Sequence, residues 1–119
     1  MSILLFFAAA QLTAQVGDWR HVMTTSDGTT TLIDGASIRR AGSLLTFWQK
    51  ELHRDGKVEG TRVRLFCESN TWQILYQQVT DPNGHVVSTL ENHLKPQEIR
   101  AGSPMEEVRA RICPVLVHN

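Results

Sequence analysis

Two cysteines and five histidines are the side chains of this sequence whose types could carry redox or metal chemistry. Cys67 and Cys113 stand far apart and form no Cys-x-x-Cys pair, so they predict no zinc cluster or redox motif. In a reducing compartment they would be two unrelated buried thiols, and in an oxidising one they would be a disulfide. Only His85 and His93 are close in sequence, and no third ligand accompanies them. We therefore expect solvated or strand-face histidines and no metal site.

Sequence motifs of catalysis are also missing. The sequence contains no G-x-S-x-G turn, no H-E-x-x-H helix and no glycine-rich phosphate loop. Ser43 and Ser103 each follow a glycine and are expected in a turn and a helix cap. Asp34, close to Ser37, is expected to cap a turn through side-chain-to-backbone hydrogen bonds. The sequence predicts neither an enzyme nor a bound cofactor.

The N-terminal segment bears on the redox compartment. Ile3–Ala10 is an uninterrupted apolar run followed by small residues, which is typical of a secretory signal. It is too short for a membrane-spanning helix, which needs about 20 apolar residues. No Lys or Arg precedes it, and the best cleavage site, after Ala14, has Leu12 at the third position before the cut. We expect a signal peptide over 1–14, a single domain over 15–119, and export to the periplasm, outer surface or medium. The alternative is a buried N-terminal strand or helix.

Length and charge limit the class of protein. The chain has 119 residues, enough for one domain, and its hydrophobic fraction of 41% is ordinary for a globular protein. Twelve Lys and Arg residues balance twelve Asp and Glu residues. A general nucleic-acid binder needs an excess of cations to displace counterions from phosphates, so we expect no nucleic-acid partner.

Short runs rich in Val, Thr and aromatic residues alternate with Gly- and Asp-containing turns up to about residue 90. Short turns of this kind favour antiparallel neighbours, and Asn83-Gly84 is the strongest hairpin signal. The predicted strands are Trp19–Thr25, Thr29–Asp34, Leu44–Leu52, Thr61–Glu68, Thr71–Thr80 and His85–Leu90.

The C-terminal part has helical periodicity. Ser103 and Glu106 are spaced as a capping box, which predicts a helix over Pro104–Cys113, with Pro114 helping to stop it. One apolar face of this helix is formed by Met105, Val108 and Ile112.

Side-chain alternation predicts how helix and sheet meet. Val63, Leu65 and Cys67 share one face of their strand, and a helix laid across that face would bring Cys113 against Cys67. A bridge there would close a loop of about 47 residues and contribute roughly 4 kcal/mol. The fold class expected is α+β: an antiparallel sheet of about six strands with one C-terminal helix packed on one face and tethered by a disulfide.

The opposite face of the same strands is the candidate binding face. It carries Arg62, Arg64 and Phe66, with Trp48 from the preceding strand. One helix covers only one face of a sheet, so this second face is available for a partner. Aromatic and arginine side chains are favoured anchors of protein interfaces. The alternation of side chains along the predicted strand Thr71–Thr80 also places Trp72, Ile74 and Tyr76 on one face of that strand. The alternatives are a sheet that curls into a partial barrel around these rings, and a homodimer.

The order and spacing of several short segments resemble a known family. These segments are Trp19, Leu32–Ile38, Phe47-Trp48, Leu65-Phe66-Cys67, Tyr76 with Asp81-x-x-Gly84, Ile99-x-x-Gly102-Ser103, and Cys113. Over about residues 18–114 the chain is similar to the surface-adhesin protein E-like domains of Gram-negative bacteria. The namesake is a lipoprotein, whereas this chain has no lipidation cysteine after its apolar run, and it has Leu94-Lys95-Pro96 where relatives often carry a Trp.

The resemblance implies a six-stranded antiparallel sheet, a disulfide-tethered C-terminal helix and export. For the namesake it also implies binding of host matrix and serum proteins such as laminin, vitronectin and plasminogen. The function expected is therefore a small exported binding module with a protein partner. The alternative is a periplasmic or envelope structural protein that acts by dimerisation or by docking to a bacterial partner.

Overall fold

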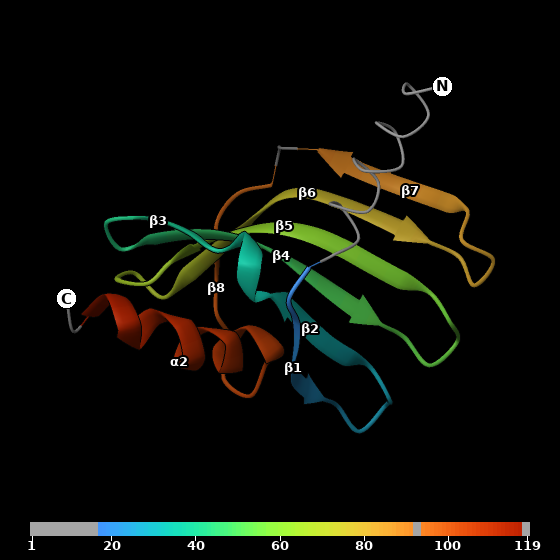
Figure 1. Ribbon diagram of the computed structural model, residues 1–119, viewed down its shortest axis with the longest axis horizontal. Coiled ribbons are helices and arrows are strands. Elements are labelled where there is room, and N and C mark those ends of the chain that lie inside the picture. Colours follow the sequence, from blue (N-terminus) through green and yellow to red (C-terminus); the bar gives the residue numbers. More distant parts are fainter. Residues whose placement is uncertain (1–16, 92–93, 118–119) are drawn as a thin grey trace, which may run out of the picture.

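The computed structural model describes residues 17–91 and 94–117 (Figure 1). The signal peptide predicted over 1–14 lies outside these residues. In chain order the elements are β1 (Trp19–Thr24), β2 (Thr30–Asp34), the 3-10 turn η1 (Gly35–Ser37), β3 (Arg39–Ala41), β4 (Leu44–Leu52), β5 (Val58–Phe66), β6 (Thr71–Thr80), β7 (Val86–Glu91), β8 (Gln97–Glu98) and α2 (Pro104–Val117).

All eight described strands belong to one open antiparallel sheet, in the order β1-β2-β4-β5-β6-β7. The two strands that the sequence did not predict are short: β3 pairs with β4, and β8 pairs with β6. The long β4–β5 hairpin turns at Gly56, whose φ of 96° only glycine adopts at low cost. Because this turn is tight, β5 begins at Val58 and not at Thr61 as predicted.

One face of the sheet packs against α2 (Figure 1). The predicted alternation is confirmed on the two central strands, where Leu45, Phe47, Val63 and Leu65 are all buried. Val108 of α2 is fully buried against them. The core is completed by Val22, Ile33, Cys67, Ile99, Met105 and Cys113.

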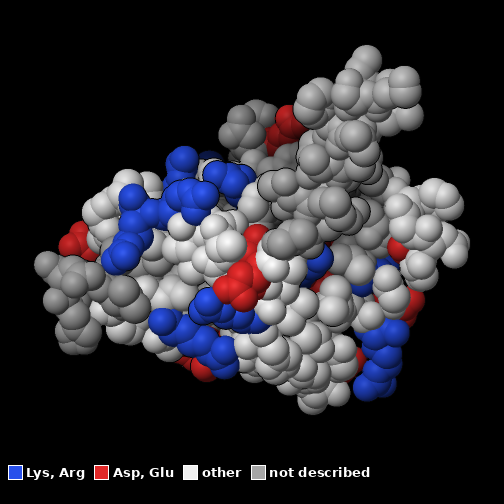
Figure 2. All heavy atoms as spheres, in the orientation of Figure 1, with Lys and Arg blue, Asp and Glu red and all other residues white. Residues whose placement is uncertain are grey.

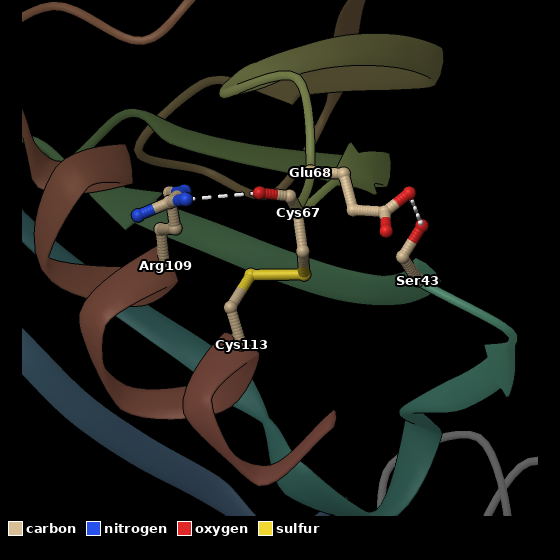
Figure 3. Close-up of a disulfide and its surroundings, with 5 residues drawn as sticks. All are labelled: Ser43, Cys67, Glu68, Arg109 and Cys113. Atoms are coloured by element: carbon tan, nitrogen blue, oxygen red, sulfur yellow. Dashed lines mark hydrogen bonds between the residues drawn. A yellow bond between two sulfur atoms is a disulfide. The ribbon is translucent and has the colours of Figure 1, made fainter. Parts of the chain in front are cut away.

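The disulfide joins Cys67, just after β5, to Cys113 in α2, with the two Cα atoms 5.7 Å apart (Figure 3). The predicted tether is therefore confirmed. Arg109 adds a second link, because its guanidinium Nη2 donates to the carbonyl oxygen of Cys67 at 2.9 Å. The loop beyond Cys67 is held to the start of β4 by the Ser43 hydroxyl, which donates to the Glu68 carboxylate at 3.1 Å.

The start of α2 is capped as predicted, with one difference. The Glu106 amide donates to the Ser103 hydroxyl at 3.3 Å, but the Glu106 carboxylate accepts from the Gly102 amide and not from that of Ser103. The predicted stop at Pro114 is wrong, because the helix continues to Val117. Proline removes one backbone hydrogen bond, but its φ of about −65° is compatible with a helix. No helix among the described residues is long and apolar enough to cross a membrane.

The two outer edges of the sheet differ. On β1, the Arg111 guanidinium of α2 donates to the backbone carbonyls of His21 and Val22 at 2.8 and 2.9 Å. On β7 all six residues are exposed, including Val86 at 52% and Val87 at 58%, and no described strand pairs with its outer side. A side chain of the helix therefore occupies part of one edge, whereas the part of the chain that the structure describes leaves the outer side of β7 free.

Candidate functional site

The predicted binding face lies on the side of the sheet opposite α2, and its centre is a contact between three side chains. Trp48 of β4 is the cross-strand partner of Arg62, and Arg62 is the partner of Tyr76 on β6. The Trp48 and Tyr76 rings meet edge to face, with centroids 6.0 Å apart. The Arg62 guanidinium carbon lies 5.8 Å from the Trp48 ring centroid, at cation–π distance. The two rings thus hold a guanidinium in the middle of a half-buried surface.

Arg64 and Phe66 extend this surface along β5. Both are half-buried, and Phe66 is the cross-strand partner of Leu44. The Nε atom of Arg64 is buried, and no described atom forms a hydrogen bond with it. No described carboxylate forms an ion pair with Arg62 or Arg64. We call Trp48, Arg62, Arg64, Phe66 and Tyr76 the aromatic–arginine surface.

Tyr76 belongs to this surface because of a β-bulge. Alternation along β6 predicted that Trp72, Ile74 and Tyr76 share one face, and this is wrong. Ile74 pairs with Val63 and Tyr76 with Arg62, so Leu75 is an extra residue in β6. The bulge places Tyr76 on the opposite face from Ile74.

A hollow of about 560 Å³ lies beside the aromatic–arginine surface, toward β1. Its walls include Trp19, Trp48 and Lys50, and the Lys50 ammonium lies 4.2 Å from the centroid of the Trp19 ring. Gly60 lines the hollow as well, and a Cβ atom there would meet only the Gln78 carbonyl, at 4.0 Å. The absence of a side chain at Gly60 therefore leaves room for a group from a partner. The sequence predicted no binding role for Trp19, Lys50 or Gly60, and Trp19 entered only through the family resemblance.

Lys and Arg atoms also gather near the β3 end of the sheet in the view of Figure 2. Arg39 and Arg40 of β3 are exposed there. Arg39 pairs with Thr46, which shares a face with Trp48, whereas Arg40 pairs with the core residue Leu45. Arg39 thus adds positive charge on the side of the aromatic–arginine surface, and Arg40 lies on the other side.

The face that carries α2 becomes polar away from the helix. Here Gln49 and Thr61 are cross-strand partners and both are buried. The Thr61 hydroxyl accepts from Gln77 at 3.1 Å, but the Gln49 amide oxygen has no partner among the described residues. A hollow of about 350 Å³ opens between this region and the loop before α2. Its lining includes Gln49, Glu51, Trp72, Arg100 and Met105.

Three potential metal ligands meet at the end of the same face. Glu51 and His53 alternate along the β4 strand and its turn, and Glu59 is the cross-strand partner of Glu51. One ligand atom from each lies within 4.8 Å of the others, and all three residues are half-buried. His53 Nε2 lies 2.8 Å from a Glu59 carboxylate oxygen. The sequence analysis missed this cluster, although the Glu-x-His spacing next to a hairpin turn was a signal for it.

The other polar residues named from the sequence have structural roles. The Asp34 carboxylate accepts from the backbone amides of Ala36 and Asp18 at 3.0 and 2.7 Å, which confirms the predicted cap. His85 is exposed and lies 3.6 Å from Asp81 in the β6–β7 turn, and His93 lies outside the described residues.

Comparison of the chain with protein-family models, curated proteins and solved structures finds no match.

Proposed function

We propose that this protein is a small exported binding module that recognises an acidic segment of another protein through the aromatic–arginine surface. The observation that carries the proposal is the Trp48–Arg62–Tyr76 contact beside Arg64, which forms no ion pair with a described carboxylate. Among the described residues no helix covers this surface, and the hollow beside it offers a concave border.

The residue types favour a protein partner. Trp, Tyr and Arg dominate the binding energy of many protein–protein interfaces. Trp and Tyr bury a large area at a low cost in conformational entropy, and Arg forms bidentate hydrogen bonds with carboxylates. Trp48 and Tyr76 hold one another in place, so little conformational freedom remains to be lost on binding.

The charges favour an acidic partner. Arg62 and Arg64 have no carboxylate partner in the described part of the chain, and Lys50 contacts a ring and not an acid. Asp34 is already engaged by two backbone amides, and Glu68, just beyond Phe66, accepts from the Ser43 hydroxyl. Glu91 lies opposite Tyr76. A partner carboxylate would meet a guanidinium ready to form a bidentate hydrogen bond.

Export is part of the proposal and rests on the disulfide together with the N-terminal sequence. Disulfides persist in oxidising compartments and are rare in reducing ones. Cys67 and Cys113 are joined, and the apolar run Ile3–Ala10 has the character of a secretory signal. The resemblance to the adhesin protein E-like domains points to host matrix and serum proteins as the first partners to test.

Binding to immobilised laminin, vitronectin and plasminogen tests the proposal. We expect at least one to bind the oxidised protein, and Arg62→Gln and Tyr76→Ser each to weaken that binding about tenfold or more. Arg40→Gln is the matched control, since Arg40 is exposed on the other side of the sheet. Equal binding by Arg62→Gln, Tyr76→Ser and Arg40→Gln, or no binding by the unaltered protein, would count against host matrix and serum proteins as partners.

The open β7 edge favours a second candidate function, an envelope assembly protein that works by dimerisation. Val86, Val87 and Leu90 are exposed along β7, and an exposed apolar edge strand is a template for pairing with another chain. Light scattering would show a dimer whose population rises with concentration. Val87→Lys should shift it to monomer without changing binding at the aromatic–arginine surface, and a concentration-independent monomer would exclude this candidate.

A further inference from the structure

We propose that Glu51, His53 and Glu59 form a binding site for a divalent transition-metal ion such as Zn²⁺. The site lies on the opposite face of the sheet from the aromatic–arginine surface, so the inference is independent of the proposed function. It rests on the geometry of the β4–β5 hairpin, on a buried hydroxyl directed at the site, and on the local balance of charge.

The hairpin fixes the three ligands on a rigid element. Glu51 and Glu59 are directly opposite in the antiparallel register, and His53 follows Glu51 by two residues, so all three side chains lie on the same face. The turn is closed by the His53 amide, which donates to the Lys57 carbonyl at 2.9 Å. Tetrahedral zinc places its N and O ligands about 3.4 Å apart, so the present spacing of 4.8 Å or less requires only small side-chain rotations.

Thr31 supplies an independent observation. It is the cross-strand partner of Glu51 on β2 and is fully buried. Its hydroxyl oxygen is buried, and no described atom meets it with hydrogen-bond geometry. Buried polar groups in folded proteins almost always have a partner, so this hydroxyl next to Glu51 points to a group that the site would hold.

Electrostatics around Glu51 also favour a bound cation. The Glu51 and Glu59 carboxylates lie on neighbouring strands at directly opposite positions. No described Lys or Arg forms an ion pair with either of them. A divalent ion between the carboxylates would relieve their repulsion.

The ligand types decide the class of metal. An imidazole nitrogen with two carboxylate oxygens suits zinc and the neighbouring transition metals, whereas Ca²⁺ and Mg²⁺ prefer sites built from oxygen alone. His53 and Glu59 retain 29% and 28% side-chain exposure, so an ion can enter from solvent. Three protein ligands leave a coordination position for water or for a group from a partner molecule.

Calorimetric titration of the oxidised, untagged protein with ZnCl₂ tests the inference. We expect saturable binding of one ion, weakened about tenfold or more by His53→Gln and by Glu59→Gln. Both side chains are partly exposed, so these variants should fold, which far-ultraviolet circular dichroism will verify. CaCl₂ and MgCl₂ should bind far more weakly than ZnCl₂.

His85→Gln is the matched control, because it removes another histidine beside a carboxylate in a hairpin turn. The imidazole nitrogen NMR shifts of His53, and not those of His85, should move on addition of zinc. The inference is overturned by no saturable binding, by equal weakening in His85→Gln, or by Ca²⁺ binding as tightly as Zn²⁺.

Discussion

The two ends of the helix-facing side of the sheet are built from the same two strands but differ in chemistry. Near α2, β4 and β5 contribute Leu45, Phe47, Val63 and Leu65, each no more than 1% exposed. We call this the apolar end. Further along the same strands come Gln49, Glu51, Glu59 and Thr61, with Thr31 from β2. We call this the polar end.

The difference separates a region that stabilises the fold from the region where we propose that a metal ion binds. The apolar end is dry, packed and covalently closed by the disulfide, so changes there should cost stability. The polar end contains buried oxygen atoms of Thr31 and Gln49 that have no hydrogen-bond partner among the residues described, which a packed core does not favour. Such groups are retained at functional sites at some cost in stability.

The largest effect should come from removing the tether at the apolar end. The bridge spans 46 residues of sequence, and constraining a loop of that length contributes about 4 kcal/mol in the chain-entropy model. Urea unfolding of the Cys67→Ala/Cys113→Ala protein should show a loss of this size relative to the oxidised protein. An unchanged midpoint would mean that α2 packs as firmly without the bond.

A core truncation should rank second. Leu65→Ala leaves a cavity at a site that is 0% exposed, and such truncations cost about 3 kcal/mol. Urea unfolding measures the change, with Leu90→Ala on the exposed β7 edge as the control. Similar losses in both variants would show that the apolar end is no better packed than the edge.

The polar end should respond in the opposite direction. Gln49 is 6% exposed and its amide oxygen has no described partner, so Gln49→Met removes a desolvated group at similar volume. We expect the free energy of unfolding to rise by about 1 kcal/mol in metal-free buffer. If stability falls as it does for Leu65→Ala, the contrast between the two ends is wrong.

The smallest effect should be a change in pH dependence from Glu51→Gln. Burial, with the nearby Glu59 carboxylate, raises the folded pKa of Glu51, so its contribution to stability is present below the ordinary value of 4.5 and is lost as the pH rises through the folded pKa. Glutamine resembles the protonated acid, so with a chelator present the variant should match the unaltered protein below pH 4.5 and exceed it increasingly as the pH rises above that value. Unfolding curves across pH measure this, with the exposed Glu91→Gln as control, and a pH-independent difference would contradict it.

The regular parts of the fold could be predicted from the alternation of apolar and polar side chains along the strands. The core face of β5 carries Val63, Leu65 and Cys67, as the alternation of side chains along the strand predicts. Cys113 reaches Cys67 because it lies next to the apolar face of the helix, which packs on that side of the sheet. Trp48 lies on the opposite face for the same reason.

The unpredicted parts depend on backbone irregularity or on strand register. Nothing in the side-chain pattern around Leu75 marks a bulge, so Tyr76 was assigned to the wrong face. The metal-ligand cluster needs Glu59 opposite Glu51, and this register follows only if β5 begins at Val58. Helix propensity alone did not indicate that α2 continues through Pro114.

The contact between Arg111 and the carbonyls of β1 has a consequence for assembly. A sheet with two free edges can add copies at both sides and grow without limit, as fibres do. Here Arg111 already occupies two backbone carbonyls of β1, whereas no described strand pairs with the outer side of β7. If two molecules joined at β7 about a twofold axis, as the second candidate function proposes, their β1 strands with these contacts would lie at the outer ends of the pair and would oppose further growth.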